Sequence, residues 1–145
     1  MASVNIYLNF NGNCEEAFNF YKSVFGGGFP YIGRFGEMPP SEGYTVSESE
    51  ANKIMHVSLP ISKETTLMGS DTAGPMAARF TVGNNFSISI NAESKEEAEK
   101  LFNGLSSGGT VTMPLSKTFW SECFGMFTDK FEINWMVSFD GNQQQ

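Results

Sequence analysis

Residues 13–28, NCEEAFNFYKSVFGGG, decide the fold, because they return 81 positions later as SKEEAEKLFNGLSSGG at residues 94–109. Each copy opens on an N-cap residue, Asn13 or Ser94, with Glu three positions on, and it closes on a run of glycines. These signals predict a capped helix of about three turns in each copy. Because a module this short cannot bury its apolar face alone, we expect the two copies to pack together and enclose the functional site between them.

The sequence that flanks the helices alternates apolar and polar residues, which is the pattern of half-buried β-strands. Ile6, Leu8 and Phe10 alternate with Asn5, Tyr7 and Asn9 before the first helix, and Phe86, Ile88 and Ile90 alternate with Asn85, Ser87 and Ser89 before the second. Further strands are predicted over residues 29–36, 53–61 and 65–69 and over residues 110–116, 123–128 and 133–139. The predicted order is therefore βαβββ, twice.

The same alternation assigns a polar face to the later strands. This face carries Ile54, His56 and Ser58 in the first copy and Asn134, Met136 and Ser138 in the second. Amides and hydroxyls are costly to bury without partners, so we expect this face to meet water while the apolar rows receive the helices. The sequence thus predicts an α+β fold whose two βαβββ modules form a cupped mixed sheet with the helices on its outer face.

The length of 145 residues indicates a single domain over residues 1–145. We expect two modules, residues 1–70 and 84–140, joined by a linker over residues 71–83. Residues 37–52 hold two Pro, one Gly and four acidic residues without periodicity, so they predict a long loop that is either a lid or a simple connection. The terminal GNQQQ is predicted to be disordered.

Composition and charge exclude several classes of function. The formal charge of −7 offers no basic footprint for nucleic acid or an anionic membrane. The chain shows neither a long apolar run nor a signal peptide, so we expect a cytoplasmic protein with no membrane partner. Cys14 and Cys123 lie far from each other and from the single His56, which predicts two free thiols, with Cys14 the more exposed because it opens a helix.

His56 is the strongest candidate for chemistry. It falls on the polar face of an otherwise apolar strand, which favours a pocket role, as proton carrier or hydrogen-bond anchor, over a place in the core. Tyr7 shares the polar row of the first strand, so its hydroxyl is expected to face the cavity. Asp71 closes a strand, which favours a turn role over that of proton acceptor. Trp120 is either a loop anchor or a pocket wall, whereas Trp135 belongs to the apolar row.

Several stretches together resemble the vicinal oxygen chelate superfamily of glyoxalase I, extradiol dioxygenases and bleomycin-resistance proteins. They are similar to its PhnB-like group, often labelled 3-demethylubiquinone-9 3-methyltransferase-like. The stretches are YLNFNGNCEEAFNFYKSVFGG at 7–27, IMHVSLPI at 54–61, LMGSD at 67–71, GGTVTMPL at 108–115, TFWSECFGMFTDKF at 118–131 and NWM at 134–136. One departure is Glu132, where the group usually has Gly.

The resemblance implies a metal-ligand set and an oligomeric state. In metal-dependent members four ligands come from the concave face, and the matching positions here are Asn5, His56, Asn85 and Met136. Only His56 is a good ligand for a divalent ion, and no carboxylate offsets the charge, so the set disfavours a divalent metal and leaves other cofactors open. The resemblance also implies a homodimer.

The function that follows is the binding of a small molecule in the concave pocket, with the reaction, and whether there is one, undetermined. The expected pocket residues are Asn5, Tyr7, His56, Asn85, Ser87, Trp120 and Met136. The alternative is a metal-dependent lyase, isomerase or dioxygenase that uses His56, and a vestigial pocket is a third possibility. Methyl transfer from S-adenosylmethionine is disfavoured, because the sequence lacks the Gly-rich loop after a strand that usually holds that cofactor.

Overall fold

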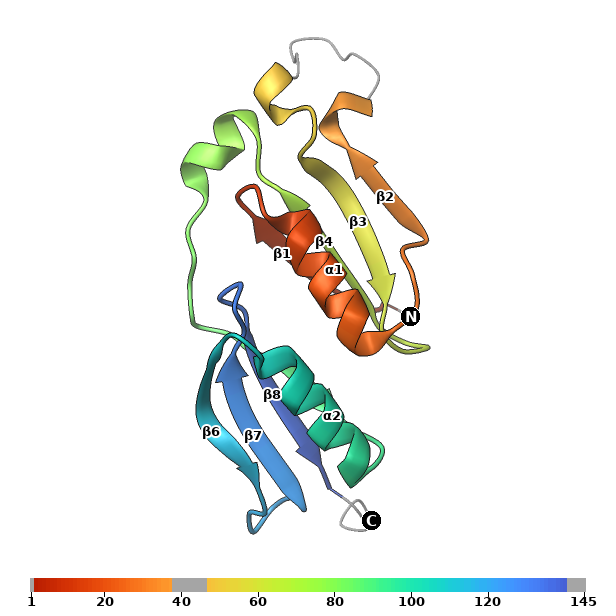
Figure 1. Cartoon of the computed structure of the whole chain (residues 1–145), viewed down its shortest axis with the longest axis vertical. Helices are drawn as coiled ribbons and strands as arrows, with labels where there is room; N and C mark the ends of the chain where they lie inside the picture. The colour runs from red at the N-terminus through yellow and green to blue at the C-terminus, as the bar shows by residue number, and fades with distance from the viewer. Residues whose placement is uncertain (1, 38–46, 141–145) are drawn as a thin grey trace. The chain divides into compact units, whose positions relative to one another are not determined.

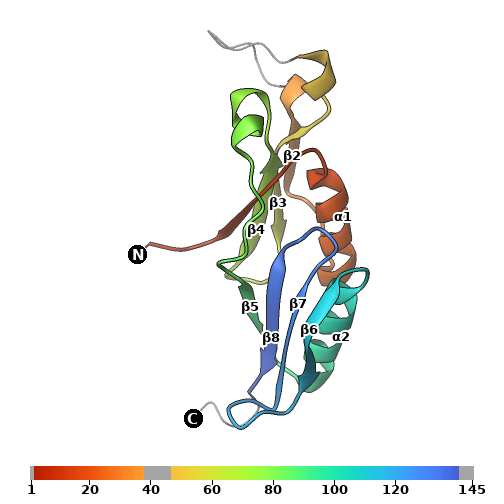
Figure 2. The same cartoon turned by 90° about the vertical axis from the view of Figure 1, so that its left-hand side faces the viewer.

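The computed structural model describes residues 2–37 and 47–140. The chain forms two compact units, Met1–Thr81 (unit 1) and Val82–Gln145 (unit 2). Each unit is one four-stranded mixed sheet with one long helix on one of its faces (Figures 1 and 2). The predicted α+β fold of two βαβββ modules is confirmed. The boundary between the units falls inside the predicted linker 71–83, while their assembly into a single domain stays a prediction.

The two units repeat one topology. Unit 1 consists of β1 (Ile6–Phe10), α1 (Cys14–Phe25), β2 (Tyr31–Arg34), η1 (Phe35–Glu37), η2 (Glu48–Glu50), β3 (Ile54–Pro60), β4 (Thr66–Asp71) and η3 (Gly74–Arg79). Unit 2 consists of β5 (Ile88–Asn91), α2 (Lys95–Ser106), β6 (Thr110–Ser116), β7 (Cys123–Thr128) and β8 (Asn134–Phe139). The sheet orders are β1-β4-β3-β2 and β5-β8-β7-β6. In each sheet the first strand is parallel to its neighbour and the other pairs are antiparallel.

The helix repeat appears in the structure with its offset of 81 residues. Helix α1 begins at Cys14 and α2 at Lys95, and both helices are 12 residues long. At the start of α2, the Oγ of Ser94 accepts a hydrogen bond from the backbone N–H of Glu97 at 3.0 Å. The Oε1 of Glu97 accepts in return from the backbone N–H of Glu93 at 2.8 Å. This reciprocal pair confirms the predicted cap of the second helix.

The capping box predicted at Asn13 is wrong. Asn13 has φ −114° and ψ 23°, and its side chain caps nothing, because an N-cap side chain reaches the helix from an extended backbone. Asp71 at the end of β4 takes its place. Its Oδ1 accepts from the backbone N–H groups of Gly12 at 2.8 Å and Cys14 at 3.0 Å. The first turn of α1 is thus stabilised by a residue 57 positions away in sequence.

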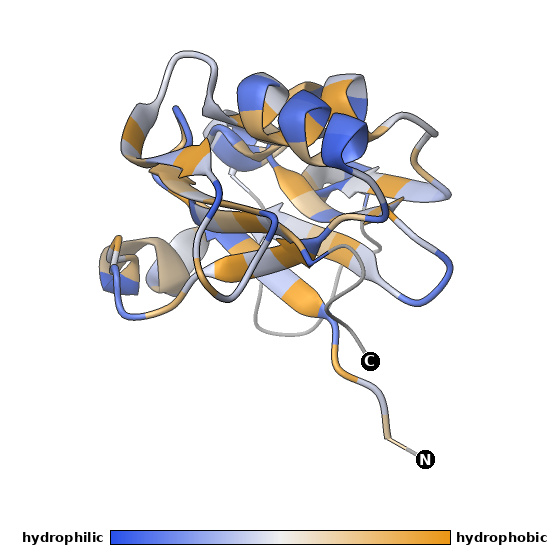
Figure 3. Ribbon diagram, turned by 90° about the horizontal axis from the view of Figure 1, so that it is seen from below, coloured by the Kyte–Doolittle hydropathy of each residue, from blue (hydrophilic) through white to orange (hydrophobic). Residues whose placement is uncertain are grey.

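The core of each unit lies between its helix and the apolar row of its sheet, and Figure 3 shows the alternation of hydropathy along the ribbons. In unit 1, Phe18 of α1 lies against Gly69 of β4: a Cβ at Gly69 would lie 2.7 Å from the Phe18 ring and 2.8 Å from the Leu8 carbonyl oxygen. The missing side chain lets the helix approach the sheet closely. In unit 2, Trp135 and Val137 of β8 are fully buried, as their apolar row predicts.

Three facing predictions are wrong, each for a local reason. Ile54 is fully buried rather than on the polar face. Gly33 pairs with His56 while Arg34 pairs with Ile54, so a β-bulge reverses the alternation before His56. Phe86 is 56% exposed, because β5 begins only at Ile88. Cys14 is fully buried although it opens α1, and its backbone N–H is bonded to Asp71 at the end of β4.

The connections differ from their predictions in detail. Strand β4 runs on to Asp71, into the predicted linker, and the 3₁₀ helix η3 follows it. Residues 47–52 of the predicted long loop contain η2, while its residues 38–46 and the terminal GNQQQ lie outside the described residues. Across the described ranges, no helix combines the length and the apolar character that crossing a membrane requires.

Candidate functional site

The open face of unit 1, opposite α1, brings two tyrosine side chains next to the single histidine of the chain. Strand register places Tyr31 beside Ser58, Ser58 beside Met68, and Met68 beside Tyr7. His56 lies two residues from Ser58 and therefore shares this face. The Oη of Tyr7 lies 3.1 Å from the Nδ1 of His56, and the ring centroids of Tyr7 and Tyr31 lie 5.5 Å and 5.7 Å from the imidazole centroid. We call Tyr7, His56 and Tyr31 the aromatic cluster.

The aromatic cluster is accessible to a ligand. Tyr7 is 44% exposed and Tyr31 is 49% exposed, while His56 is half-buried between them. Tyr31 lies over Gly33, since a Cβ at Gly33 would lie 2.7 Å from its Oη. Among the residues the structure describes, the only hydrogen bond of the imidazole is that of Nδ1. The pair can pass a proton between phenol and imidazole, and Nε2 stays available to a bound molecule.

Asn5, the other predicted pocket residue of unit 1, has a structural contact. Its Oδ1 accepts a hydrogen bond from the backbone N–H of Thr66 at 3.1 Å. This bond ties the chain before β1 to the first residue of β4. The amide oxygen that the resemblance offers as a metal ligand is therefore already engaged within the sheet.

Unit 2 has a pocket of about 680 Å³, and all the residues that line it belong to this unit. The lining residues are Val82, Gly83, Asn84, Ser87, Thr112, Met126, Phe127, Thr128, Glu132, Asn134 and Trp135. Of the predicted residues, Ser87 belongs to this pocket, while Asn85 and Met136 do not line it. We call it the unit 2 pocket.

Met136 belongs to a row of three methionines on the open face of unit 2. Register pairs Met136 of β8 with Met126 of β7, and Met126 with Met113 of β6. All three side chains are at least partly exposed. Met136 is a predicted pocket residue, whereas the row itself is not predictable from residue patterns, because only the register of the strands brings these residues together.

Trp120 lies in the connection between β6 and β7 and is 49% exposed. Its ring makes edge contacts with Phe119 at 4.7 Å and Phe124 at 5.5 Å between centroids. It does not line the unit 2 pocket. Its predicted role as a pocket wall stays a prediction.

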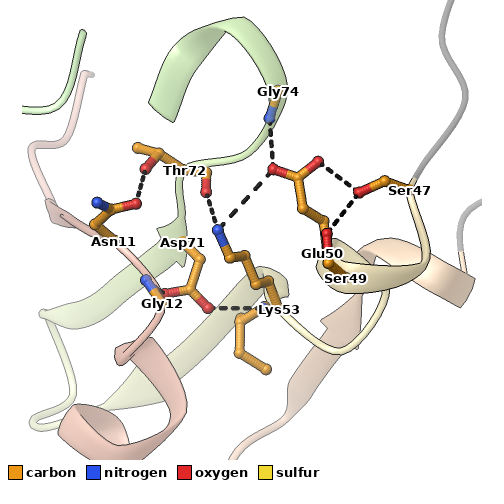
Figure 4. Close-up of polar contacts among 10 residues, drawn as sticks. Asn11, Gly12, Ser47, Ser49, Glu50, Lys53, Asp71, Thr72 and Gly74 are labelled. Carbon is orange, nitrogen blue, oxygen red and sulfur yellow. Dashed lines mark hydrogen bonds and ion pairs between the residues drawn. The ribbon is translucent and has the colours of Figure 1, made fainter. Parts of the chain in front are cut away.

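Asp71 makes structural contacts at the end of β4. The residue is buried, with 4% of its surface exposed. Its Oδ2 accepts from the backbone N–H of Ile54 at 2.9 Å, while Oδ1 accepts from the N–H groups of Gly12 and Cys14 at the start of α1. Figure 4 shows the polar network around it, in which Glu50 accepts from the backbone N–H of Gly74 at 2.9 Å and meets Lys53 at 4.0 Å. These contacts join the ends of β1, β3 and β4 to the 3₁₀ helices.

Nucleophilic and metal chemistry find little support in the described residues. Burial raises the pKa of the Cys14 thiol above its ordinary value, and the charges of Asp71 and Glu15 raise it further. A thiol held in its neutral form is a poor nucleophile. Within residues 2–37 and 47–140, no three His, Cys, Asp or Glu side chains are grouped so as to hold a metal ion. The donors present therefore do not fit a divalent metal of the glyoxalase type.

Comparison with known proteins identifies relatives over nearly the full chain. The family model described as 3-demethylubiquinone-9 3-methyltransferase matches residues 2–138. Protein YjdN of Escherichia coli (strain K12) is 30% identical over 138 residues, which cover 91% of each chain. Protein PA1353 from Pseudomonas aeruginosa has a crystal structure that matches with a TM-score of 0.82 and 40% identity, over 97% of this chain and 98% of that one.

Two further solved structures connect the group to the wider fold. A putative 3-demethylubiquinone-9 3-methyltransferase, PhnB protein, from Bacillus cereus matches with a TM-score of 0.73 and 26% identity, over 95% of this chain and 99% of that one. A glyoxalase-related enzyme from Fulvimarina pelagi shares the fold alone, with a TM-score of 0.60 and 14% identity over 96% of this chain and 88% of that one. The chain shares the fold of a glyoxalase-related enzyme, and it belongs to the PhnB-like 3-demethylubiquinone-9 3-methyltransferase family.

Proposed function

We propose that the protein binds a small organic molecule with a flat or apolar body on the open face of unit 1, and that Tyr7 and His56 anchor its polar group. The observation that carries this proposal is the hydrogen bond of 3.1 Å between Tyr7 Oη and His56 Nδ1 on an exposed sheet face. An exposed pair of this kind adds little to stability, so a role toward a ligand explains its position better than a role in folding.

The aromatic cluster supports a particular kind of ligand. The Tyr7 and Tyr31 rings flank the imidazole and offer large apolar surfaces with hydroxyl groups at their ends. A planar molecule can stack on such rings while its polar group reaches His56 Nε2. We expect the remaining predicted residues of the concave face, Asn5, Asn85, Ser87, Trp120 and Met136, to affect binding less than the aromatic cluster does.

The experiment is a binding titration with three matched probes, 2-naphthol, 2-naphthoate and naphthalene. We expect the two polar probes to shift the NMR signals of Tyr7, His56 and Tyr31. His56→Ala should weaken the affinity for these two probes by about tenfold, which corresponds to one lost polar anchor. The control Glu64→Gln changes an exposed turn residue outside the cluster and leaves binding unchanged. Equal binding of all three probes to wild-type protein and His56→Ala would contradict the proposal.

The alternative from the sequence is a metal-dependent lyase, isomerase or dioxygenase that uses His56. It requires near-stoichiometric metal in protein that has never met a chelator, and loss of that metal in His56→Ala. Elemental analysis of the two proteins decides between the hypotheses, since a binding protein that works through the aromatic cluster needs no metal.

We propose a cytoplasmic homodimer as the working form. The support for the dimer is the resemblance to vicinal oxygen chelate proteins. The formal net charge of −7 disfavours nucleic acid as a further partner. Sedimentation equilibrium of the full chain tests the dimer, and a monomer at tens of micromolar would contradict it.

A further inference from the structure

We propose that unit 2 carries a second binding site, for an organic cation, in which the carboxylate of Glu132 is the charged partner. This site lies on residues other than the aromatic cluster and is independent of the function proposed for unit 1. Its support is a strained backbone position, a pocket beside it, and the charge of the groups that line that pocket.

Glu132 holds an unfavourable backbone conformation. Its φ is +73°, and no other non-glycine residue in the described ranges has a positive φ. The left-handed region is disfavoured for residues with a Cβ, and such strain persists only where the surroundings impose it. A glycine would fit this turn without strain. The turn itself therefore does not explain why the residue is Glu, and we look for an explanation in what surrounds the turn.

Asp129 imposes this conformation. Its backbone oxygen accepts from the N–H of Glu132 at 2.9 Å, and its Oδ1 accepts from the N–H groups of Phe131 at 2.7 Å and Ile133 at 3.0 Å. Its Oδ2 accepts from the indole Nε1 of Trp135 at 2.8 Å. Asp129 and Trp135 are both buried, so the turn is fixed to the core and the backbone of Glu132 is held in one position.

Glu132 is one of the residues that line the unit 2 pocket. The turn that carries Glu132 connects β7 to β8, and Thr128 and Asn134 on either side of it also line the pocket. These two side chains are joined by a hydrogen bond of 2.6 Å from Thr128 Oγ1 to Asn134 Oδ1. Asn134 Nδ2 reaches the Phe86 carbonyl oxygen at 3.5 Å, which holds the segment before β5 against the hairpin.

The charge and chemistry of the lining favour a cation. Glu132 is the only charged residue among the lining residues, and neither Lys nor Arg is one of them. The carboxylate has no ion pair in the described part of the chain. Hydroxyl groups of Ser87 and Thr128 add acceptors, and Met126 adds an adaptable apolar surface. A primary ammonium group on an apolar body satisfies all three features, and the net charge of −7 attracts it at long range.

The test is an NMR titration of the full chain with phenethylamine and with 2-phenylethanol, which differ in the charged group alone. We expect both probes to shift amide signals in residues 84–87 and 126–134, and the amine to bind about threefold to tenfold more tightly, as a partly exposed ion pair allows. Glu132→Gln keeps the strained backbone and loses the charge, so it abolishes this preference. Glu132→Gly also abolishes it, while the midpoint of thermal unfolding stays equal or rises by up to about 3 °C because strain is relieved.

Two matched controls make the outcome specific. Glu99→Gln removes the same charge from the exposed surface of α2 and leaves the preference for the amine intact. His56→Ala removes the anchor proposed for unit 1 and also leaves it intact. Equal affinities of wild-type protein for amine and alcohol, an unchanged preference in Glu132→Gln, or an equal loss in Glu99→Gln would each overturn the proposal.

Discussion

The hydroxyl of Tyr7 and the Nδ1 of His56 meet at 3.1 Å although their strands, β1 and β3, are not neighbours in the sheet. The two side chains reach each other across β4, on the face of the sheet opposite α1. A hydrogen bond formed over the open surface of a sheet adds nothing to the pairing of the strands beneath it. We expect this hydrogen bond to orient the Tyr7 hydroxyl and the imidazole toward a molecule that binds on this face.

Tyr7→Phe is expected to leave the fold intact. Tyr7 is 44% exposed, so its hydroxyl exchanges a protein partner for water, and the free energy of unfolding should fall by less than about 1 kcal/mol. Urea denaturation measures this change. Tyr31→Phe is the control, since it removes a hydroxyl from the same cluster without the bond to Nδ1. A loss above about 2 kcal/mol in Tyr7→Phe would assign the pair to stability instead of binding.

Asp71→Asn is expected to destabilise unit 1 strongly. The buried carboxylate accepts from the backbone N–H groups of Gly12, Cys14 and Ile54. An amide in its place turns an NH₂ group toward at least one of these donors, so the free energy of unfolding should fall by about 2–4 kcal/mol. Glu64→Gln, on an exposed turn, serves as the control in the same urea series. Wild-type stability in Asp71→Asn would show that water satisfies these donors.

The sequence predicts the repeated architecture well, because the signals that specify it are local. Helix periodicity, the glycines after each helix and the alternation of Leu8 and Phe10 all act within a few residues. Gly26 after α1 and Gly108 after α2 indeed take positive φ values of 84° and 80°. The cap of α1 escaped prediction because it comes from Asp71, on a strand that meets this helix only in three dimensions.

The candidate sites were predicted only in part, for the same reason. Alternation along each strand predicts that Tyr7 and His56 share the polar face, whereas Tyr31 joins them only through the register of β2 on β3. The strain of Glu132 depends on the hydrogen bonds that Asp129 makes within the turn and with Trp135, which residue patterns do not reveal. Alternation describes a single strand, whereas a site depends on register between strands.

Cys14 should resist thiol reagents in the folded protein. Its side chain is fully buried, and burial next to the negative charges of Asp71 and Glu15 raises its pKa, so the reactive thiolate is scarce. Titration with Ellman's reagent should label Cys14 only after a denaturant is added. Cys123→Ser isolates the signal of Cys14. Rapid labelling of that variant under native conditions would contradict the buried position of this thiol.

The ion pair between Glu15 and Arg34 should make a small contribution to stability that depends on pH. Arg34 donates to both carboxylate oxygens of Glu15, at 3.0 Å and 2.7 Å, and this bonding lowers the pKa of Glu15. Because the folded pKa lies below the unfolded one, the contribution is complete above the ordinary range of Glu and is lost as the pH falls through the folded value. Both side chains are partly exposed, so its size should be only about 0.5–1 kcal/mol.

Glu15→Gln tests this contribution in urea denaturation at pH 7 and at pH 3. The variant should be less stable than wild type at pH 7, and the difference should shrink toward pH 3. Glu16→Gln is the matched control, since Glu16 shares the acidic first turn of α1 and makes no ion pair with Arg34. A difference that is equal at both pH values would show that the charge of Glu15 is not the cause.

Gly69→Ala and Gly33→Ala give a matched pair, because both glycines lie in strands of unit 1 but face opposite sides. A Cβ at Gly69 meets the backbone carbonyl oxygen of Leu8 at 2.8 Å and the Phe18 ring at 2.7 Å. The first contact can be relieved only by shifting β1 in the sheet, and the second only by moving α1 or the Phe18 ring. We expect a loss of about 2–4 kcal/mol in the free energy of unfolding.

A Cβ at Gly33 meets only the Tyr31 side chain, 2.7 Å from its Oη. This side chain can swing away over the open face. Gly33→Ala should therefore lose less than about 1 kcal/mol yet weaken the binding of 2-naphthol, because Tyr31 leaves its place beside His56. Equal losses of stability in the two variants would contradict the assignment of one face to the core and the other to a ligand.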